Sequence, residues 1–272
     1  MCRHLAWLGP AVDLAALLLD PPHSLLRQSY APGDMRGGGT VNADGFGAGW
    51  YPDGNGPPGD RRGGLAGDGG GAPAGDRAPV RYRRAVPMWT DPSFAALARV
   101  VRSGAVLAAV RSATVGMPVV ETACAPFAAG RWLFSHNGVV ARWPRSMAGL
   151  ARCLPVTDLL TLEAPTDSAL LWALVRHRLR AGESPGSALG AVTAEVLAAA
   201  PGSRLNLLVT DGTVLAATAV HHALWVRACD GGVLVCSEPT DQAPGWRPVP
   251  DGHLLTATPS TVDVAPIPLT TV

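Results

Sequence analysis

The order of strand-like and helix-like segments constrains the fold of this chain most, because helices separate groups of strands and do not follow every strand. Alternating or continuous apolar runs predict strands, and a 3.6-residue apolar period predicts the main helices. The predicted strands cover residues 1–8, 45–51, 80–86, 105–114, 131–140, 205–210, 213–220, 224–228, 232–236 and 253–258. The predicted helices cover residues 14–19, 91–102, the segment after 166–168, and 187–200. This order favours an α+β fold with largely antiparallel sheets over a doubly wound dinucleotide-binding fold.

Two local details accompany these helices. Asp13 is expected to cap the helix at 14–19, since aspartate is a preferred N-cap residue. In the helix after residue 168, the arginines Arg176, Arg178 and Arg180 are expected to face water, opposite an apolar stripe.

A Gly/Pro-rich segment interrupts the pattern at 52–79, where glycine and proline fill 15 of 28 positions. Such a segment buries too little apolar surface to offset its backbone entropy, so we expect a mobile surface insertion. Strand-like sequence resumes on both sides of it. The sequence therefore predicts a single domain over 1–272 that carries a flexible insertion at about 52–79.

Charge and composition exclude several functions. The 22 basic residues, all of them arginine, balance 21 acidic residues to give a net charge of +1, so nucleic acid is not an expected partner. The absence of lysine eliminates a Schiff-base lysine, a phosphate-loop lysine and a Ser–Lys dyad. No stretch approaches the roughly 18 uncharged apolar residues of a membrane span, so a membrane is not an expected partner either.

The five cysteines are scattered and form no C-x-x-C pair. This usage indicates a reducing cytoplasm and mostly buried thiols, not a disulfide framework or a zinc site. His4 and the His221-His222 pair lack metal-ligand spacing, and we interpret them as structural.

Cys2 is the most informative single position. Removal of Met1 would place a thiol and a free α-amino group on one residue, and an α-amine with a pKa of about 7.7–8.0 can act as a general base. Such a nucleophile needs no separate histidine or lysine for activation. The alternative is a chance cysteine in a disordered tail, although residues 2–7 begin a strand-like run.

Four short motifs resemble those of class II glutamine amidotransferases and occur in the same order: Met1-Cys2-Arg3-His4, 42–47 (NADGFG), 111–114 (RSAT) and 135–138 (SHNG). These proteins are N-terminal-nucleophile hydrolases that cleave γ-glutamyl amides. The motifs lie within about residues 1–180. The resemblance implies a four-layer αββα sandwich with largely antiparallel sheets, and it implies that Cys2 is the nucleophile.

The resemblance also implies two further catalytic groups. The side-chain amide of Asn137 and the backbone N–H of Gly138 would stabilise the tetrahedral oxyanion of amide cleavage, which needs preorganised donors. Glycine at 138 would let a backbone N–H approach the reacting centre closely. The alternative for His136-Asn137-Gly138 is an ordinary hairpin turn.

Three residues are implied in substrate binding. Arg111 would hold the α-carboxylate of the glutamyl group, a task that suits a planar bidentate donor, and Thr114 would shape the same pocket. Asp167 would receive the α-ammonium group. The alternatives are a structural ion pair for Arg111 and a helix cap for Asp167. Asn42 and Asp44 are expected to support a glycine-rich turn near the pocket.

Longer matches at 3–9, 20–22, 28–32, 108–118 and 125–127 make the chain most similar to the γ-glutamyl hydrolases of actinobacterial ergothioneine biosynthesis. That resemblance implies hydrolysis of γ-glutamyl-hercynylcysteine sulfoxide through a Cys2 thioester, without metal or organic cofactor. No phosphate loop or synthetase domain is visible, so we expect a stand-alone amidohydrolase; the sequence leaves the oligomeric state open. Val115 stands where synthetase-linked members carry histidine, which suggests that the substrate is not free glutamine.

Two rival functions are also compatible with the sequence. One is a glutaminase or another γ-glutamyl amide hydrolase, including an amidotransferase subunit that passes ammonia to a separate protein. The other is a catalytically silent binding module that keeps the same fold.

Overall fold

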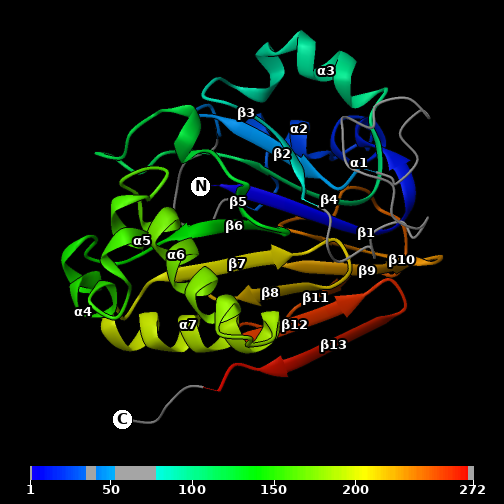
Figure 1. Cartoon of the computed structure of the whole chain (residues 1–272). Helices are drawn as coiled ribbons and strands as arrows, with labels where there is room; N and C mark the ends of the chain where they lie inside the picture. The colour runs from blue at the N-terminus through cyan, green and yellow to red at the C-terminus, as the bar shows by residue number, and fades with distance from the viewer. Residues whose placement is uncertain (1, 35–40, 53–77, 269–272) are drawn as a thin grey trace, which may run out of the picture.

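Two antiparallel sheets form the centre of the molecule, as Figure 1 shows. The computed structural model describes residues 2–34, 41–52 and 78–268. Sheet A has the order β11-β9-β10-β1-β4-β2-β3. Its strands are β1 (Arg3–Asp13), β2 (Phe46–Trp50), β3 (Val80–Arg84), β4 (Arg102–Val110), β9 (Trp225–Cys229), β10 (Gly232–Cys236) and β11 (Arg247–Pro248).

Sheet B has the order β13-β12-β8-β7-β6-β5. Its strands are β5 (Phe127–Ala129), β6 (Trp132–Val139), β7 (Arg204–Thr210), β8 (Leu215–Ala219), β12 (His253–Thr258) and β13 (Thr261–Pro266). In both sheets the paired strands run antiparallel.

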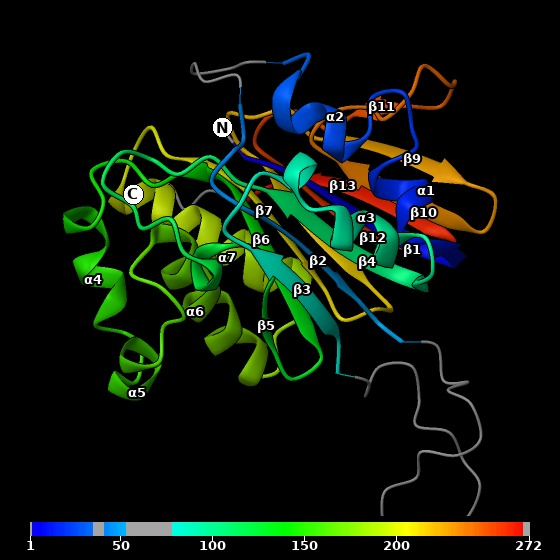
Figure 2. The ribbon, with the colours of Figure 1, turned by 90° about the horizontal axis from the view of Figure 1, so that it is seen from above.

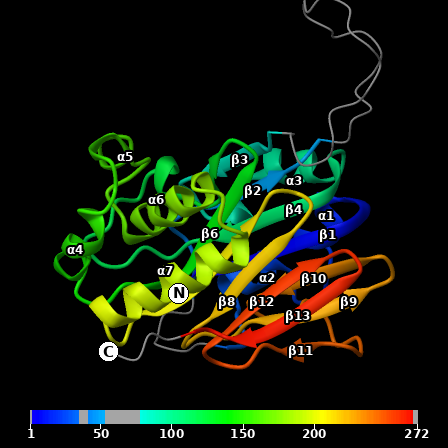
Figure 3. The same ribbon diagram turned by 60° about the horizontal axis from the view of Figure 1, so that its bottom comes forward.

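Helices cover the outer face of each sheet, and Figure 2 shows the two helical layers on opposite sides. Helices α1 (Leu14–Leu18), α2 (Leu25–Tyr30) and α3 (Pro92–Ala98) share a hydrophobic cluster with sheet A. Helices α6 (Asp167–Arg180) and α7 (Pro185–Ala199) share one with sheet B, and α7 packs on β8 and β12 (Figure 3). The short helices α4 (Ala148–Ala151) and α5 (Val156–Leu160) lie between β6 and α6 in the chain, and the 3-10 helices are η2 (Met88–Thr90), η3 (Glu121–Ala123) and η4 (Arg145–Met147). This arrangement confirms the predicted αββα sandwich.

The first strand shows why its sequence is apolar without interruption. Side chains of a strand alternate between its two faces. Leu5 and Trp7 belong to the cluster under the outer helices, whereas Ala6 and Leu8 belong to the cluster between the two sheets. Because both faces of sheet A are covered, every one of these positions is buried.

Several predicted boundaries were wrong. Strand β1 begins at Arg3 and continues to Asp13, with an irregular register between Leu8 and Val12, and the helix predicted at 91–102 ends at Ala98 because β4 already begins at Arg102. The flexible insertion was predicted at about 52–79, and its residues 53–77 lie outside the described residues. The flanking strands β2 and β3 pair directly.

Charged side chains account for two further corrections. Asp13 makes no cap hydrogen bond and instead pairs with Arg102 at 3.3 Å. Arg176 and Arg178 do not simply face water, because both are partly buried and form ion pairs. Arg180 is exposed, as predicted, and also forms an ion pair. The carboxylate of Asp158 in α5 binds both Arg176 and Arg180.

The thiols are less buried than predicted. Cys124 and Cys236 are buried, Cys2 and Cys229 are half-buried, and Cys153 is exposed. Among the described ranges, no helix has the length and apolar character needed to cross a membrane.

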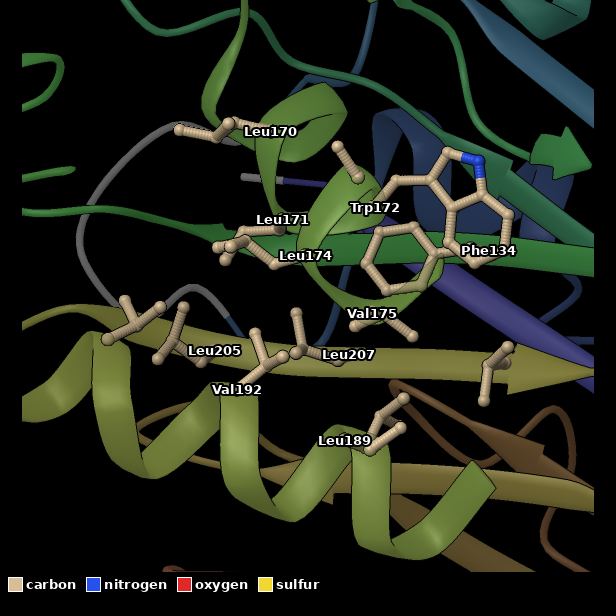
Figure 4. Close-up of a cluster of buried hydrophobic side chains, with 14 of the residues drawn as sticks. Phe134, Leu170, Leu171, Trp172, Leu174, Val175, Leu189, Val192, Leu205 and Leu207 are labelled. Atoms are coloured by element: carbon tan, nitrogen blue, oxygen red, sulfur yellow. The ribbon is translucent and has the colours of Figure 1, made fainter. Parts of the chain in front are cut away.

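The cluster between sheet B and its helices holds this half of the molecule together, and Figure 4 shows its side chains converging from β6, β7, α6 and α7. The ring of Phe134 stacks on that of Trp172, with centroids 5.3 Å apart and planes inclined by 17°. Both rings lie almost entirely out of contact with solvent. Their burial fixes α6 against β6.

We expect Phe134→Ala to lower the free energy of unfolding by about 3–5 kcal/mol, because it removes a buried ring and leaves a cavity. Chemical denaturation followed by circular dichroism measures this loss. Val100→Ala is the control, since Val100 is exposed and should change stability by no more than about 0.5 kcal/mol. Similar effects of the two substitutions would contradict this view of the core.

Candidate active site

Cys2 lies beside Arg111 because of the strand register. In the pairing of β1 with β4, Arg3 stands opposite Val110, so the residues just beyond this pair are Cys2 and Arg111. The half-buried Cys2 thiol lies 3.7 Å from the backbone carbonyl of Ser112. Together with short apolar side chains and Phe127, Cys2 and Arg111 line one pocket.

A turn holds the backbone of Arg111. The N–H of Arg111 donates to the carbonyl of Gly45 at 2.8 Å, and its own carbonyl accepts from the N–H of Asp44 at 3.0 Å. The Asp44 carboxylate in turn accepts from the N–H of Ala113 at 2.7 Å. Gly45 has a φ of +129°, and a side chain there would collide with the Cys124 sulfur. The chain bends at Asp44 just before β2, whereas Phe46 and Gly47 of the predicted turn at 42–47 already belong to β2.

The guanidinium of Arg111 has donors to spare. It donates to the carbonyl of Pro118 at 2.9 Å. Within the described residues, no carboxylate lies close enough to form an ion pair with it, so the structural ion pair considered above is not found there. A guanidinium carries five N–H donors, so this arrangement leaves several for a ligand.

Asn137 lies on the same strand as pocket residues, but its side chain points the other way. Its amide Nδ2 donates to the hydroxyl of Ser237 at 3.1 Å, on the side of sheet A. Its Oδ1 is buried and has no hydrogen-bond partner among the described residues. It borders a small polar cavity together with Arg3, His222 and Glu238.

Gly138 has a packing reason for being glycine. A Cβ at this position would collide with the backbone carbonyl of Arg204 on β7. Gly138 stands opposite Leu205 in the β6–β7 ladder, so the hairpin turn that was the alternative for residues 136–138 is not the structure at this position.

Asp167 and Thr114 differ in their surroundings. The buried Asp167 carboxylate accepts from the N–H of Val140 at 3.0 Å and from the N–H of Ser168 at 2.8 Å. It does not cap α6, because Thr166 does so by accepting from the N–H of Ala169. Thr114 lies on the exposed loop after β4 and is not among the residues that line the Cys2 pocket.

The structure adds two residues that sequence reasoning did not assign to the site. His136 and Ser168 line the Cys2 pocket, and the His136 ring contacts the Ser168 hydroxyl at 3.0 Å. They are direct neighbours of Asn137 and Asp167. The alternation of side chains along a strand could have indicated His136, because it turns residues 136 and 137 to opposite faces.

Two buried histidines lie near this region. The ring Nδ1 of His4 contacts the Ser135 hydroxyl at 2.8 Å, while neither ring nitrogen of His222 has a partner among the described residues. Burial, reinforced by nearby positive groups, lowers the pKa of each to about 3. Both rings are therefore neutral at physiological pH. The described residues contain no cluster of three or more His, Cys, Asp or Glu side chains arranged to hold a metal ion.

Comparison with solved structures gives the class of the fold. The chain is similar to the solved structure of a glutamine aminotransferase class-II domain protein from Silicibacter pomeroyi, with a TM-score of 0.64, 24% identity, and coverage of 98% of this chain and 99% of that one. The fold is therefore that of the class II glutamine amidotransferases, which are N-terminal-nucleophile hydrolases. No protein-family model matches the chain.

Curated relatives define the family more closely. A γ-glutamyl-hercynylcysteine sulfoxide hydrolase of Mycolicibacterium smegmatis is 42% identical over 98% of this chain and its own full length. The protein of the same name from Mycobacterium tuberculosis is 40% identical over 95% of this chain and 93% of its own. The chain belongs to the family of γ-glutamyl-hercynylcysteine sulfoxide hydrolases. The resemblance drawn from the sequence motifs is confirmed.

The buried histidines predict an acid-dependent loss of stability. A histidine with a folded pKa near 3 and an ordinary value of 6.5 binds more protons when unfolded, so stability falls as pH falls from about 6.5 towards 3. We expect His222→Gln to reduce this fall, because it removes one of the two groups. Urea midpoints at about pH 7 and about pH 5 measure the slope. Equal slopes for the variant and the wild type would contradict the assignment.

Proposed function

We propose that this chain hydrolyses the γ-glutamyl amide of γ-glutamyl-hercynylcysteine sulfoxide to glutamate and hercynylcysteine sulfoxide. The observation that carries the proposal is that Cys2 and Arg111 line one pocket in a chain that shares 42% identity with a full-length relative of that name. This is a place where a thiol nucleophile and a carboxylate-binding cation would meet one substrate.

The nucleophile is the Cys2 thiol. After removal of Met1, the α-amine of Cys2 accepts the thiol proton, directly or through water, because its pKa of about 7.7–8.0 lies close to physiological pH. The thiolate attacks the γ-carbonyl carbon. The protonated amine then delivers a proton to the departing nitrogen, and water hydrolyses the remaining thioester to glutamate.

Asn137 and Gly138 are the proposed oxyanion donors. The Asn137 amide nitrogen carries two hydrogens, and the bond to Ser237 uses one of them. The second hydrogen and the Gly138 N–H would stabilise the oxyanion. The buried Oδ1 of Asn137, which lacks a partner among the described residues, is a suitable acceptor for the protonated α-amine.

Arg111 and Asp167 are the proposed contacts of the glutamyl group. The spare donors of Arg111 suit the α-carboxylate. The Asp167 carboxylate accepts two backbone hydrogen bonds and keeps lone pairs for the α-ammonium group. Thr114 stays a proposed pocket residue, for which a movement of the loop after β4 would be needed.

The leaving group carries a trimethylammonium, a cation that aromatic faces bind. We propose that the enzyme acts in the cytoplasm on this small molecule as a stand-alone, single-domain hydrolase. The reaction as written needs no metal or organic cofactor, and neither nucleic acid, a membrane nor a synthetase domain takes part in it.

The direct test measures glutamate released from γ-glutamyl-hercynylcysteine sulfoxide and from glutamine. We expect the wild type to prefer the first substrate and Cys2→Ala to release no glutamate from either while retaining its circular dichroism spectrum. Intact mass should show that Met1 is absent. Preference for glutamine would support a glutaminase instead, unchanged release by Cys2→Ala would exclude the nucleophile, and a retained Met1 would exclude the amine as base.

We expect Arg111→Ala to raise KM by about 10- to 100-fold, because it removes charge-assisted hydrogen bonds to the substrate carboxylate. Steady-state kinetics measure the change. Arg99→Ala is the matched control, since Arg99 is an exposed arginine paired with Asp20. An unchanged KM in Arg111→Ala would refute the proposed contact.

A further inference from the structure

Glu238 gathers hydrogen bonds from three separate parts of the chain. One carboxylate oxygen accepts from Nε of Arg3 at 2.6 Å. The other accepts from the N–H of Gly33 at 2.7 Å and contacts the ring of His23 at 2.6 Å. The Glu238 backbone carbonyl accepts from the buried side chain of Gln28 at 3.3 Å. We call these residues the Glu238 cluster.

The cluster is buried and charged. The side chains of Arg3 and Glu238 are only 3% and 5% exposed. Although burial raises the pKa of Glu238, the His23 hydrogen bond, the Arg3 charge and the Gly33 N–H outweigh it and lower that pKa to about 2. Glu238 is thus ionised at physiological pH, and a buried charge of this kind is stable only where its partners are well placed.

The guanidinium of Arg3 links this anion to Cys2. While its Nε binds Glu238, one terminal nitrogen donates to the carbonyl of Cys2 at 3.0 Å and the other donates to the carbonyl of Asp34. The planar guanidinium has its donors in a fixed fork, so fixing one edge fixes the direction of the others. Glu238 therefore determines where Arg3 aims its bond to Cys2.

A first residue needs such an anchor. After removal of Met1, a single peptide bond attaches Cys2 to the chain, and ordering one residue's backbone costs roughly 1–2 kcal/mol. The carbonyl of Cys2 shares its residue with both the thiol and the α-amine. A bond to that carbonyl restrains both reacting groups at once.

We propose that Glu238 is a positioning residue, which holds Arg3 so that the guanidinium fixes the mature N-terminal Cys2 in the orientation that attack requires. The inference rests on the proposed function, in which Cys2 is the nucleophile. Its neighbour Ser237 supports it from a second direction, since the Ser237 hydroxyl accepts from the N–H of His4 at 3.0 Å and from Asn137. Two adjacent residues after β10 thus hold different parts of the site: Glu238 binds Arg3, and Ser237 binds His4 and Asn137.

The test compares Glu238→Gln with wild type in the mature full-length protein. Glutamine keeps the side-chain size, but its amide nitrogen cannot accept a hydrogen bond, so one side of the cluster is lost. We expect kcat to fall about tenfold or more, with KM changed by less than about threefold. We also expect an aminopeptidase to remove Cys2 faster from Glu238→Gln than from the wild type. Intact-mass measurements over time give this trimming rate. This second readout reports the anchoring of the terminus without substrate.

Asp158→Asn is the matched control. Asp158 is also buried and paired with two arginines, but it lies in α5, away from the Glu238 cluster. The Asp158→Asn substitution should leave kcat and the rate of Cys2 removal at the wild-type values. If Asp158→Asn reproduced both changes, general destabilisation would explain them and the proposal would be overturned.

If Glu238→Gln does not fold, Arg3→Lys tests the same positioning role. Lysine preserves the charge opposite Glu238 but lacks the fork that reaches Cys2, so both readouts should change as before. Wild-type kcat or wild-type trimming in either folded variant would overturn the positioning role. A wild-type enzyme that releases no glutamate from γ-glutamyl amides would instead reject the proposed function, and the trimming rates would still decide the anchoring.

Discussion

The position of β1 between two antiparallel neighbours is the constraint on which the candidate site depends. β4 and β10 pair with it on either side, so its backbone is restrained along both edges. The register with β4 brings Cys2 to Arg111, and the register with β10 brings Ser237 and Glu238 to His4 and Arg3. A one-residue slip would turn every side chain of β1 to the other face and separate these groups.

Polar groups gather where the strands end because the sandwich interior is apolar. The cluster between the sheets contains aliphatic side chains over most of its extent, so charges such as those of Arg3 and Glu238 occur at its margin with partners in place. The alternation of β6 divides this margin in two. His136 faces the Cys2 pocket, and Asn137 faces the polar cavity beside Arg3. The two cavities therefore flank the start of β1.

Much of the fold followed from local patterns. The strand predicted at 232–236 coincides with β10, and the αββα layering followed from the family motifs. Helix α2 was missed because its six residues, which include Gln28 and Ser29, are too few to display a helical period. The prediction that Cys2 and Arg111 belong to one site rested on the family motifs and not on periodicity. No local pattern in the sequence indicated roles for Glu238 and His23, because these roles arise from side-chain contacts between segments far apart in the chain.

The pairing of β1 with β10 joins segments that lie far apart in the sequence, since Leu5 stands opposite Cys236. During synthesis the first strand emerges long before this partner exists, and such distant pairing forms late because loop closure must come first. Until then, the surroundings that the folded structure gives to Cys2 are incomplete. The environment of Cys2 is therefore completed only after β10 has been synthesised, and a shorter polypeptide that lacks β10 cannot yet organise the candidate site.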